Sequence, residues 1–334
     1  MTIARSLLET ALPVGLSLFL YSPFIRLMQR LSWGQEIRPE GPEDHLSKKG
    51  TPTMGGAVLI TTLLTVFAWS GTHDLPLLVL VAVTLFHAGL GAVDDYTKIA
   101  KKRSLGLKAR QKLVAQIAIG AFVGIFAVWY APHAAVWLPF AGWTTSPVVR
   151  VLLAAATVVG ASNALNLTDG LDGLAAGTSI SAFLAYAVIC CSCSLPGLAL
   201  ACRVLVGACA GFLWFNAFPA RVFMGDTGSL ALGAALGTVA VLTHTEFLLF
   251  VIGGVFALEA ISVMTQVSVF KLSRGRLGFY TVGQTRRVFR MSPIHHHFCK
   301  GGLHEVQVTT RMWIASAGLA ILGITVYFLH FAPR

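Results

Sequence analysis

Charged residues are scarce in this chain of 334 residues. Asp, Glu, Lys and Arg make up only 12% of it, whereas hydrophobic residues make up 55%, and the mean hydropathy is +0.74. A soluble domain usually carries about 25% charged residues. The composition therefore excludes an ordinary soluble domain and predicts an all-α, polytopic integral membrane protein.

Other features are missing as well. The first apolar run begins near Leu7 and leads into Arg26 and Arg30 with no small-residue cleavage site, so we expect a retained span and not a signal peptide. The chain has no long internal repeat, low-complexity segment or evident soluble domain. We therefore expect a single transmembrane domain over residues 1–334.

Cysteine patterns typical of zinc or redox sites are weak. Cys190 and Cys193 form a C-x-x-C pair, but neither a histidine nor a second such pair accompanies them. The cysteines between 190 and 209 lie within or beside apolar segments. We interpret them as small buried hydrophobic residues.

Apolar segments long enough to cross a bilayer recur along the chain. A span needs about 20 residues, with a range of about 17–25. About ten segments meet this measure: 7–28, 54–70, 75–93, 112–131, 147–163, 174–192, 198–217, 228–244, 247–270 and 309–331. The longer connection at 131–147 is expected to form a small hairpin or an interfacial element.

Lysine and arginine are concentrated in every second loop, and the alternate loops contain almost none. The positive-inside rule therefore places the basic loops in the cytoplasm, and an even number of spans places both termini outside. The net charge of +11 arises from these loops. This distribution favours attraction to anionic lipids and substrates, and we expect no nucleic-acid partner.

Residues 163–173 interrupt two apolar segments with two amides, a hydroxyl and two carboxylates. Carboxylates at membrane depth cost about 2.5–3.5 kcal/mol each and therefore mark function by default. Asn166, Asp169 and Asp172 recur at three-residue spacing, so they line one face if the segment is helical. The alternative is an ordinary polar turn between two spans.

Two adjacent carboxylates, Asp94 and Asp95, close the third span. Neighbouring side chains on a helix point about 100° apart, so the pair can serve a metal and a proton transfer separately. A helix end solvated at the interface is the alternative. His87 shares a face with Asp94 and is interpreted as an interior histidine. Lys98 and the basic residues after it either bind phosphate or serve membrane orientation alone.

A glycine-flanked turn at 218–229 carries a third carboxylate, Asp226, near the start of the eighth span. In such a turn a carboxylate can approach Mg²⁺ while backbone N–H groups and Ser229 face phosphate. Phe223 either stacks on a base or anchors the turn at the interface.

Two further stretches supply polar groups. The motif SKKGTPTMGG places Lys48, Thr53 and free N–H groups at a helix start, which suits an anion, and a basic linker is the alternative. In the ninth span, Glu259, Ser262 and Gln266 form a polar stripe. This stripe either faces a cavity or makes hydrogen bonds between helices.

Three adjacent histidines, His295, His296 and His297, lie in the last cytoplasmic loop. They could bind a transition metal, but the carboxylates elsewhere suit a hard ion such as Mg²⁺, which prefers oxygen. We interpret the histidines as donors to a phosphorylated substrate. A metal site and a solvated loop are the alternatives.

The expected cytoplasmic face therefore combines several carboxylates, many cations and glycine-rich turns. Carboxylates that hold Mg²⁺, with cations around them, are typical of phosphoryl transfer. An active-site cleft on the cytoplasmic face of a membrane protein implies that one reactant is a lipid. The competing class is a membrane transporter, which would place its carboxylates near the midplane and not at helix ends.

Five motifs, in consistent order from about residue 45 to the end, resemble the phospho-N-acetylmuramoyl-pentapeptide transferase family (translocase I). These motifs are SKKGTPTMGG, GAVDDYTK, NALNLTDGLDGLA, FNAFPARVFMGDTGS and MSPIHHHF. The wider family of polyprenyl-phosphate N-acetylhexosamine-1-phosphate transferases shares the Asp-Asp and Asn-x-x-Asp features. TPTMGG and the triple histidine point to the muramoyl-pentapeptide branch.

The resemblance implies a reaction in peptidoglycan synthesis at the bacterial cytoplasmic (inner) membrane. Phospho-MurNAc-pentapeptide would pass from UDP-MurNAc-pentapeptide to undecaprenyl phosphate, with UMP released and Mg²⁺ required. The resemblance also implies ten transmembrane helices, a homodimer and a cytoplasmic cleft. A sister transferase that uses UDP-GlcNAc is the enzymatic alternative.

Residue by residue, the resemblance makes Asp226 the Mg²⁺ ligand and Asp94 the catalytic carboxylate, assisted by Asp95. Substrate-binding roles follow for Lys48, Thr53, Lys98, Asn166, Asp169, Asp172, Phe223, Ser229, Gln266, His295, His296 and His297. Arg110 stands where a family lysine is expected, and whether Lys112 replaces it stays open. We hypothesise in-line attack by the lipid phosphate; a two-step route through Asp94 or Asp95 is the alternative.

Overall fold

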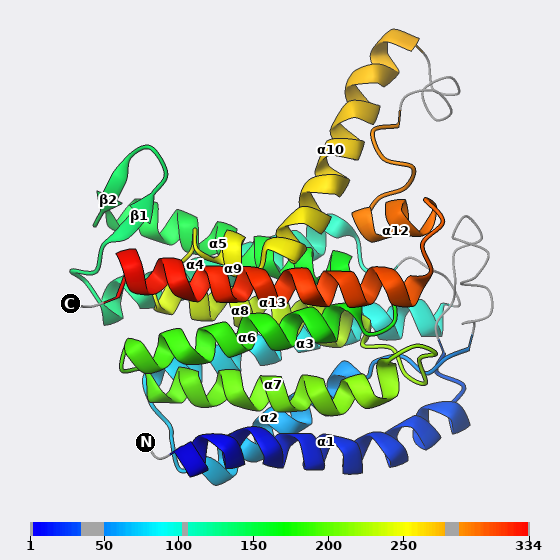
Figure 1. Cartoon of the computed structure of the whole chain (residues 1–334), viewed down its shortest axis with the longest axis horizontal. Coiled ribbons are helices and arrows are strands. Elements are labelled where there is room, and N and C mark those ends of the chain that lie inside the picture. Colours follow the sequence, from blue (N-terminus) through cyan, green and yellow to red (C-terminus); the bar gives the residue numbers. More distant parts are fainter. Residues whose placement is uncertain (1–2, 35–49, 102–105, 278–286, 333–334) are drawn as a thin grey trace.

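The computed structural model describes residues 3–34, 50–101, 106–277 and 287–332. Within these ranges almost all regular structure is helical (Figure 1). The helices are α1 Ile3–Arg30, α2 Gly56–Ser70, α3 Leu75–Ala100, α4 Ala109–Tyr130, α5 Pro147–Thr168, α6 Leu174–Ser192, α7 Pro196–Asn216, α8 Gly225–Leu242, α9 Leu249–Ile252, α10 Gly254–Leu277, α12 Ile294–Cys299 and α13 Glu305–His330.

In the described part of the chain, nine helices are long and apolar enough to cross a membrane. The predicted all-α, polytopic architecture is thereby confirmed. The tenth expected span, 54–70, is present as the shorter apolar helix α2 of 15 residues. The start of α1 and the end of α13 lie at the same end of the bundle (Figure 1).

The connection before α5 contains a small antiparallel hairpin, as expected for 131–147. Strand β1 (Val136–Leu138) pairs with β2 (Gly142–Thr144), and Trp137 lies opposite Trp143. The hairpin lies at the same end of the molecule as the two chain ends (Figure 1).

Helices α6, α7 and α8 are the most buried spans. Small residues also allow the backbones of neighbouring helices to approach closely. Helices associate in this way in lipid, where the hydrophobic driving force between them is absent. A Cβ atom on Gly56 would clash with the backbone of Gly228, and one on Gly91 would clash with the carbonyl of Asp226. The starts of α2 and α8 and the end of α3 are therefore pressed together.

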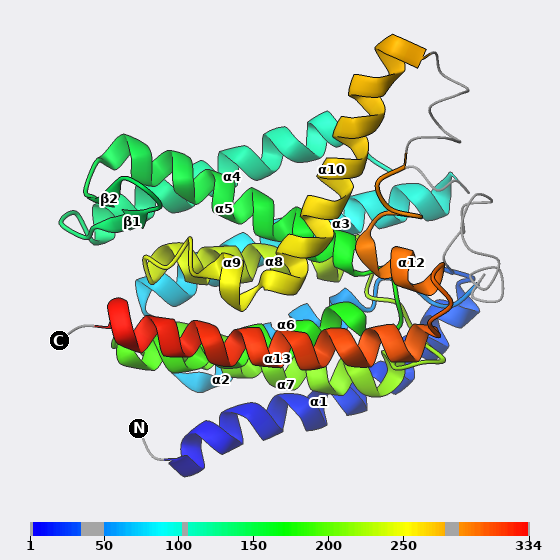
Figure 2. The same cartoon turned by 45° about the horizontal axis from the view of Figure 1, so that its top comes forward.

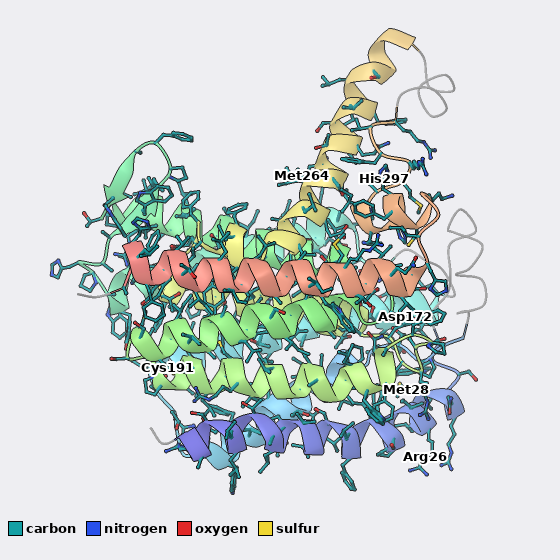
Figure 3. All side chains as sticks on the ribbon, viewed as in Figure 1. Arg26, Met28, Asp172, Cys191, Met264 and His297 are labelled. Atoms are coloured by element: carbon teal, nitrogen blue, oxygen red, sulfur yellow. The ribbon has the colours of Figure 1, made fainter. Side chains whose placement is uncertain are left out.

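Helix α10 departs from this arrangement. The long helices run side by side, whereas α10 leans away from the bundle, and α12 packs near it at one end (Figures 1 and 2). Asp172 and His297 lie at that end of the molecule, together with Arg26, whereas Cys191 lies at the other (Figure 3).

Candidate active site

The three carboxylates of Asp94, Asp95 and Asp226 meet where α3 crosses the start of α8. One oxygen from each lies within 4.8 Å of the others, although 131 residues separate Asp95 from Asp226. The side chains of Asp94 and Asp95 are 1% and 4% exposed, and that of Asp226 is 13% exposed. Carboxylates with so little exposure to water repel one another strongly unless cations lie beside them.

Two lysines supply that compensation. Lys98 Nζ lies 2.8 Å from Asp94 Oδ2 and 3.1 Å from Asp226 Oδ1. Lys112 Nζ lies 3.2 Å from Asp94 Oδ1 and 2.9 Å from Asp226 Oδ2. Arg110, by contrast, is exposed. Of the two basic residues considered for this position, Lys112 is the one that reaches the carboxylates.

Asp95 is bound to the start of α8. Its Oδ1 accepts a hydrogen bond from the Asp226 N–H (3.1 Å), and its Oδ2 accepts from the N–H (2.9 Å) and hydroxyl (2.8 Å) of Thr227. The first N–H groups of a helix lack intrahelical partners and carry the positive end of the helix dipole. Asp95 therefore caps α8 and fixes the backbone that carries Asp226.

Asp94 has different neighbours. Its Oδ1 accepts a hydrogen bond from the Leu107 N–H at 2.7 Å, in addition to its contacts with the two lysines. The segment before α4 packs directly on the carboxylate, and a Cβ atom on Gly106 would clash with it. Asp94 thus joins the end of α3 to the start of α4.

Asn166 brings α5 to the same site. Its amide donates to Asp226 Oδ1 at 3.1 Å and to the Ser229 hydroxyl at 2.8 Å, and that hydroxyl donates to the carbonyl of Gly225. Asn166, Ser229 and Asp226, three of the residues expected from the sequence, are therefore in direct contact.

Asp169 follows the end of α5. Burial raises the pKa of its carboxyl to about 7, and the nearby carboxylates of Asp226, Asp95 and Asp172 act in the same direction. At neutral pH the group is consequently divided between its acid and its carboxylate forms. A cation brought to the site would favour the carboxylate.

Asp172 makes hydrogen bonds with two segments that are distant in the sequence. Its Oδ2 accepts from the Ala220 N–H at 2.9 Å, and its own N–H donates to Glu305 Oε1 at 2.8 Å. The residue thereby links the loop after α5 to the turn before α8 and to the start of α13. Its expected substrate contact stays a prediction.

Two of the sequence motifs form one unit. Phe223 N–H donates to the Pro52 carbonyl and Gly55 N–H donates to the Phe223 carbonyl, both at 2.8 Å. Met54 adopts a φ of 64° where the chain turns into α2. Thr53 is buried and Phe223 is half-buried. Lys48 lies outside the described residues.

The histidines form a second cluster between α10 and α12. His295 is fully buried; its Nδ1 lies 3.1 Å from Glu259 Oε2, and its ring packs so closely on Gly170 that a Cβ atom there would clash. The ring of His296 lies against that of His295, with centroids 4.2 Å apart. This cluster therefore touches the loop that contains Asp169.

His297 and Gln266 contact the segment before α12. His297 Nδ1 accepts from the Arg290 N–H at 3.0 Å. Gln266 Oε1 accepts from the N–H groups of Val288 (3.2 Å) and Phe289 (3.1 Å). The amide oxygen of Gln266, a residue expected to bind substrate, thus holds this segment against α10.

Comparisons with known proteins show which family the chain resembles. Residues 77–244 match the family described as glycosyl transferase family 4. The chain is 45% identical to the phospho-N-acetylmuramoyl-pentapeptide-transferase of Desulfotalea psychrophila, over 92% of this chain and 89% of that protein. It is 44% identical to the enzyme of that name from Geobacillus kaustophilus, over 90% and 91% of the two chains.

The chain belongs to the phospho-N-acetylmuramoyl-pentapeptide-transferase family. Two contacts at this site could not be assigned from the sequence. Lys112 stands in a basic loop, where positive-inside orientation alone accounts for a lysine. The pairing of Glu259 with His295 joins residues 36 positions apart, and only the polar stripe on the ninth span pointed to the glutamate.

Proposed function

We propose that this chain transfers phospho-MurNAc-pentapeptide from UDP-MurNAc-pentapeptide to undecaprenyl phosphate in peptidoglycan synthesis, with release of UMP. Membership of the transferase family supports this reaction. The observation that carries it is the meeting of three carboxylates and two lysines at one end of the bundle. A phosphoryl transfer needs both the cations and the metal-binding oxygens of such a cluster.

The donor atoms fit Mg²⁺. Hard cations take carboxylate oxygens, and Asp94, Asp95 and Asp226 each offer one within 4.8 Å of the others. We assign Asp226 as the ligand, with Lys98 and Lys112 giving up part of their contact with it. When bound, Mg²⁺ would neutralise charge that develops on the diphosphate.

The two adjacent aspartates have separate roles in this proposal. Asp95 positions Asp226 through the start of α8, because both of its oxygens are already hydrogen-bonded there. Asp94 orients the acceptor phosphate. The second pKa of a phosphate is about 6, so at neutral pH the acceptor needs little deprotonation. We therefore favour one in-line step over a route in which either aspartate is a nucleophile.

The remaining expected residues are assigned by their place around the cluster. Lys98 and Lys112 hold the diphosphate, and Asn166, Asp169 and Ser229 line its side. Further substrate contacts come from Lys48, Thr53, Asp172, Phe223, Gln266, His295, His296 and His297. The histidine cluster touches the loop at 169–173 through Gly170, which supports its place at the edge of the site.

The proposed setting is the bacterial cytoplasmic membrane. The basic loops face the cytoplasm, both termini lie outside, and the chain acts as a homodimer built from a single transmembrane domain. The distribution of lysine and arginine and the apolar spans support this orientation.

The test is UMP release by the purified protein in detergent, with undecaprenyl phosphate and either UDP-MurNAc-pentapeptide or UDP-GlcNAc, with and without Mg²⁺. We expect Mg²⁺-dependent release from the first nucleotide sugar alone. Release from UDP-GlcNAc alone would identify the sister transferase. No release from either, with folded protein, would favour a transporter.

A further inference from the structure

A second layer of hydrogen bonds lies directly beneath the carboxylate–lysine cluster. Gln116 of α4 is 1% exposed, and its amide donates to the Ser162 hydroxyl of α5 at 3.2 Å. That hydroxyl donates to the Leu230 carbonyl of α8 at 3.0 Å. The amide of Asn163 donates to Gln116 Oε1 at 2.9 Å. Three helices are thus joined by side chains that carry no charge.

The residues of this layer lie four positions along their helices from residues of the active site. Gln116 follows Lys112 by four residues, and Leu230 follows Asp226 by four. Ser162 precedes Asn166 by four, on a helix of opposite direction. Four residues are about one turn, or about 6 Å along the axis. The three helices that supply Lys112, Asp226 and Asn166 are therefore joined again one turn deeper.

The packing explains why such a joint matters. Helix α5 lies between α4 and α8 (Figure 2). A Cβ atom on Gly233 of α8 would lie 2.6 Å from Ser162 Cα, and one on Gly120 of α4 would lie 2.8 Å from Ala155 Cα. Glycine contacts of this kind bring two helix backbones close together. They do not stop one helix from sliding along the other or rotating about its own axis, and polar side chains can fix both.

We infer that Gln116 is a positioning residue of the transfer reaction: through Ser162 and Asn163 it sets the register of α4, and so holds Lys112 between Asp94 and Asp226. Gln116 does not touch the reacting groups itself. This inference rests on the proposed function, since it assigns Lys112 a task in that reaction.

The main test is Gln116→Met, which keeps the length of the side chain and removes both polar groups. We expect kcat for UMP release to fall about tenfold, because small displacements of a catalytic group are costly, while KM for both substrates stays within about twofold. Thr238→Val is the matched control, since within the described part of the chain the buried Thr238 hydroxyl bonds to Ala234 of its own helix and to no other element. Its kcat should match that of the wild type.

A double substitution separates positioning from a general structural role. If Gln116 acts through Lys112, then Gln116→Met should have no further effect on kcat once Lys112 is already Met. Additive losses, or a raised KM with an unchanged kcat, would overturn the inference. A wild-type kcat for Gln116→Met would do the same while leaving the transferase itself intact.

Folding is checked by thermal unfolding in the same detergent. If Gln116→Met does not fold, Ser162→Ala breaks the same connection with a smaller change in volume. A lower kcat with unchanged KM for Ser162→Ala supports the inference, and a wild-type kcat overturns it. Failure of wild-type UMP release would refute the proposed function instead, which keeps the two outcomes distinct.

Discussion

The two ends of the helical bundle use charged residues differently. At the end that carries the chain termini, two charged residues bind backbone groups at the ends of helices. Arg150 donates to the carbonyls of Ala127, Ala131 and Pro132 at the end of α4. Asp74 accepts from the N–H groups of Leu77 and Gly197, at the starts of α3 and α7.

At the opposite end, like charges are gathered. Asp94, Asp95 and Asp226 lie close together and two lysines lie against them. The carboxylates repel one another, and so do the two lysines, so each group would have a lower electrostatic energy farther from groups of the same charge. A charge that binds helix ends without like charges beside it is structural, whereas like charges that the fold holds close together mark the functional site.

Lys112→Met should lower kcat by about 100-fold, because the proposed reaction would lose one of the two cations assigned to the diphosphate. The same substitution at the exposed Arg110 should change kcat by less than about threefold, since that side chain lies outside the cluster. Steady-state UMP release measures both. An equal loss in the two variants would refute the assignment of Lys112.

Asp95→Asn and Asp94→Asn should be separated by their effects on folding. Both lower kcat, but only Asp95→Asn should also lower stability, by about 1 kcal/mol, because it weakens the cap of α8. Thermal unfolding of the two variants, measured alongside UMP release, makes the comparison. Equal unfolding temperatures would show that Asp95 does not position the helix.

Arg150→Met tests the other end of the bundle. Loss of the three hydrogen bonds that the Arg150 guanidinium donates should reduce stability by about 2 kcal/mol, whereas kcat of the folded enzyme should stay within about twofold of wild type. Chemical or thermal unfolding measures the first quantity and UMP release the second. A large fall in kcat with unchanged stability would reverse the assignment of this end.

Asp169 provides a test through the pH dependence of stability. Because its pKa is raised to about 7 in the folded protein, the folded state binds an extra proton between the ordinary aspartate pKa of about 4 and pH 7. Its contribution to stability therefore falls as pH rises through this window. Asp169→Asn should flatten the pH dependence of unfolding measured without metal. An unchanged profile would contradict the pKa shift.

Hydropathy and charge distribution predicted most of the fold, because lipid forces apolar spans and basic loops to follow simple rules. The helix α2 lies at the expected place but is short, and the lean of α10 could not be foreseen because it depends on packing. The cluster of Asp94, Asp95 and Asp226 was expected from chemistry and from family motifs.

The separate contacts of the individual site residues could not be predicted. That Asp95 caps α8 depends on the crossing of α3 and α8, which the sequence does not describe. Spacing predicted a place for Asp172 beside Asn166 and Asp169, but not its hydrogen bonds with Ala220 and Glu305, which come from distant segments. The layer beneath the site, with Gln116 at its centre, appears only when three helices are placed side by side.

The most direct test of the central claim is the Mg²⁺ dependence of UMP release for wild type and Asp226→Asn, with UDP-MurNAc-pentapeptide and undecaprenyl phosphate in detergent. The claim is that this carboxylate, held by α8 between two lysines, serves the metal. We predict that wild-type release rises with Mg²⁺ and saturates, whereas the folded variant shows no release above background at any Mg²⁺ concentration. Release from the variant with a wild-type dependence on Mg²⁺ would contradict the claim.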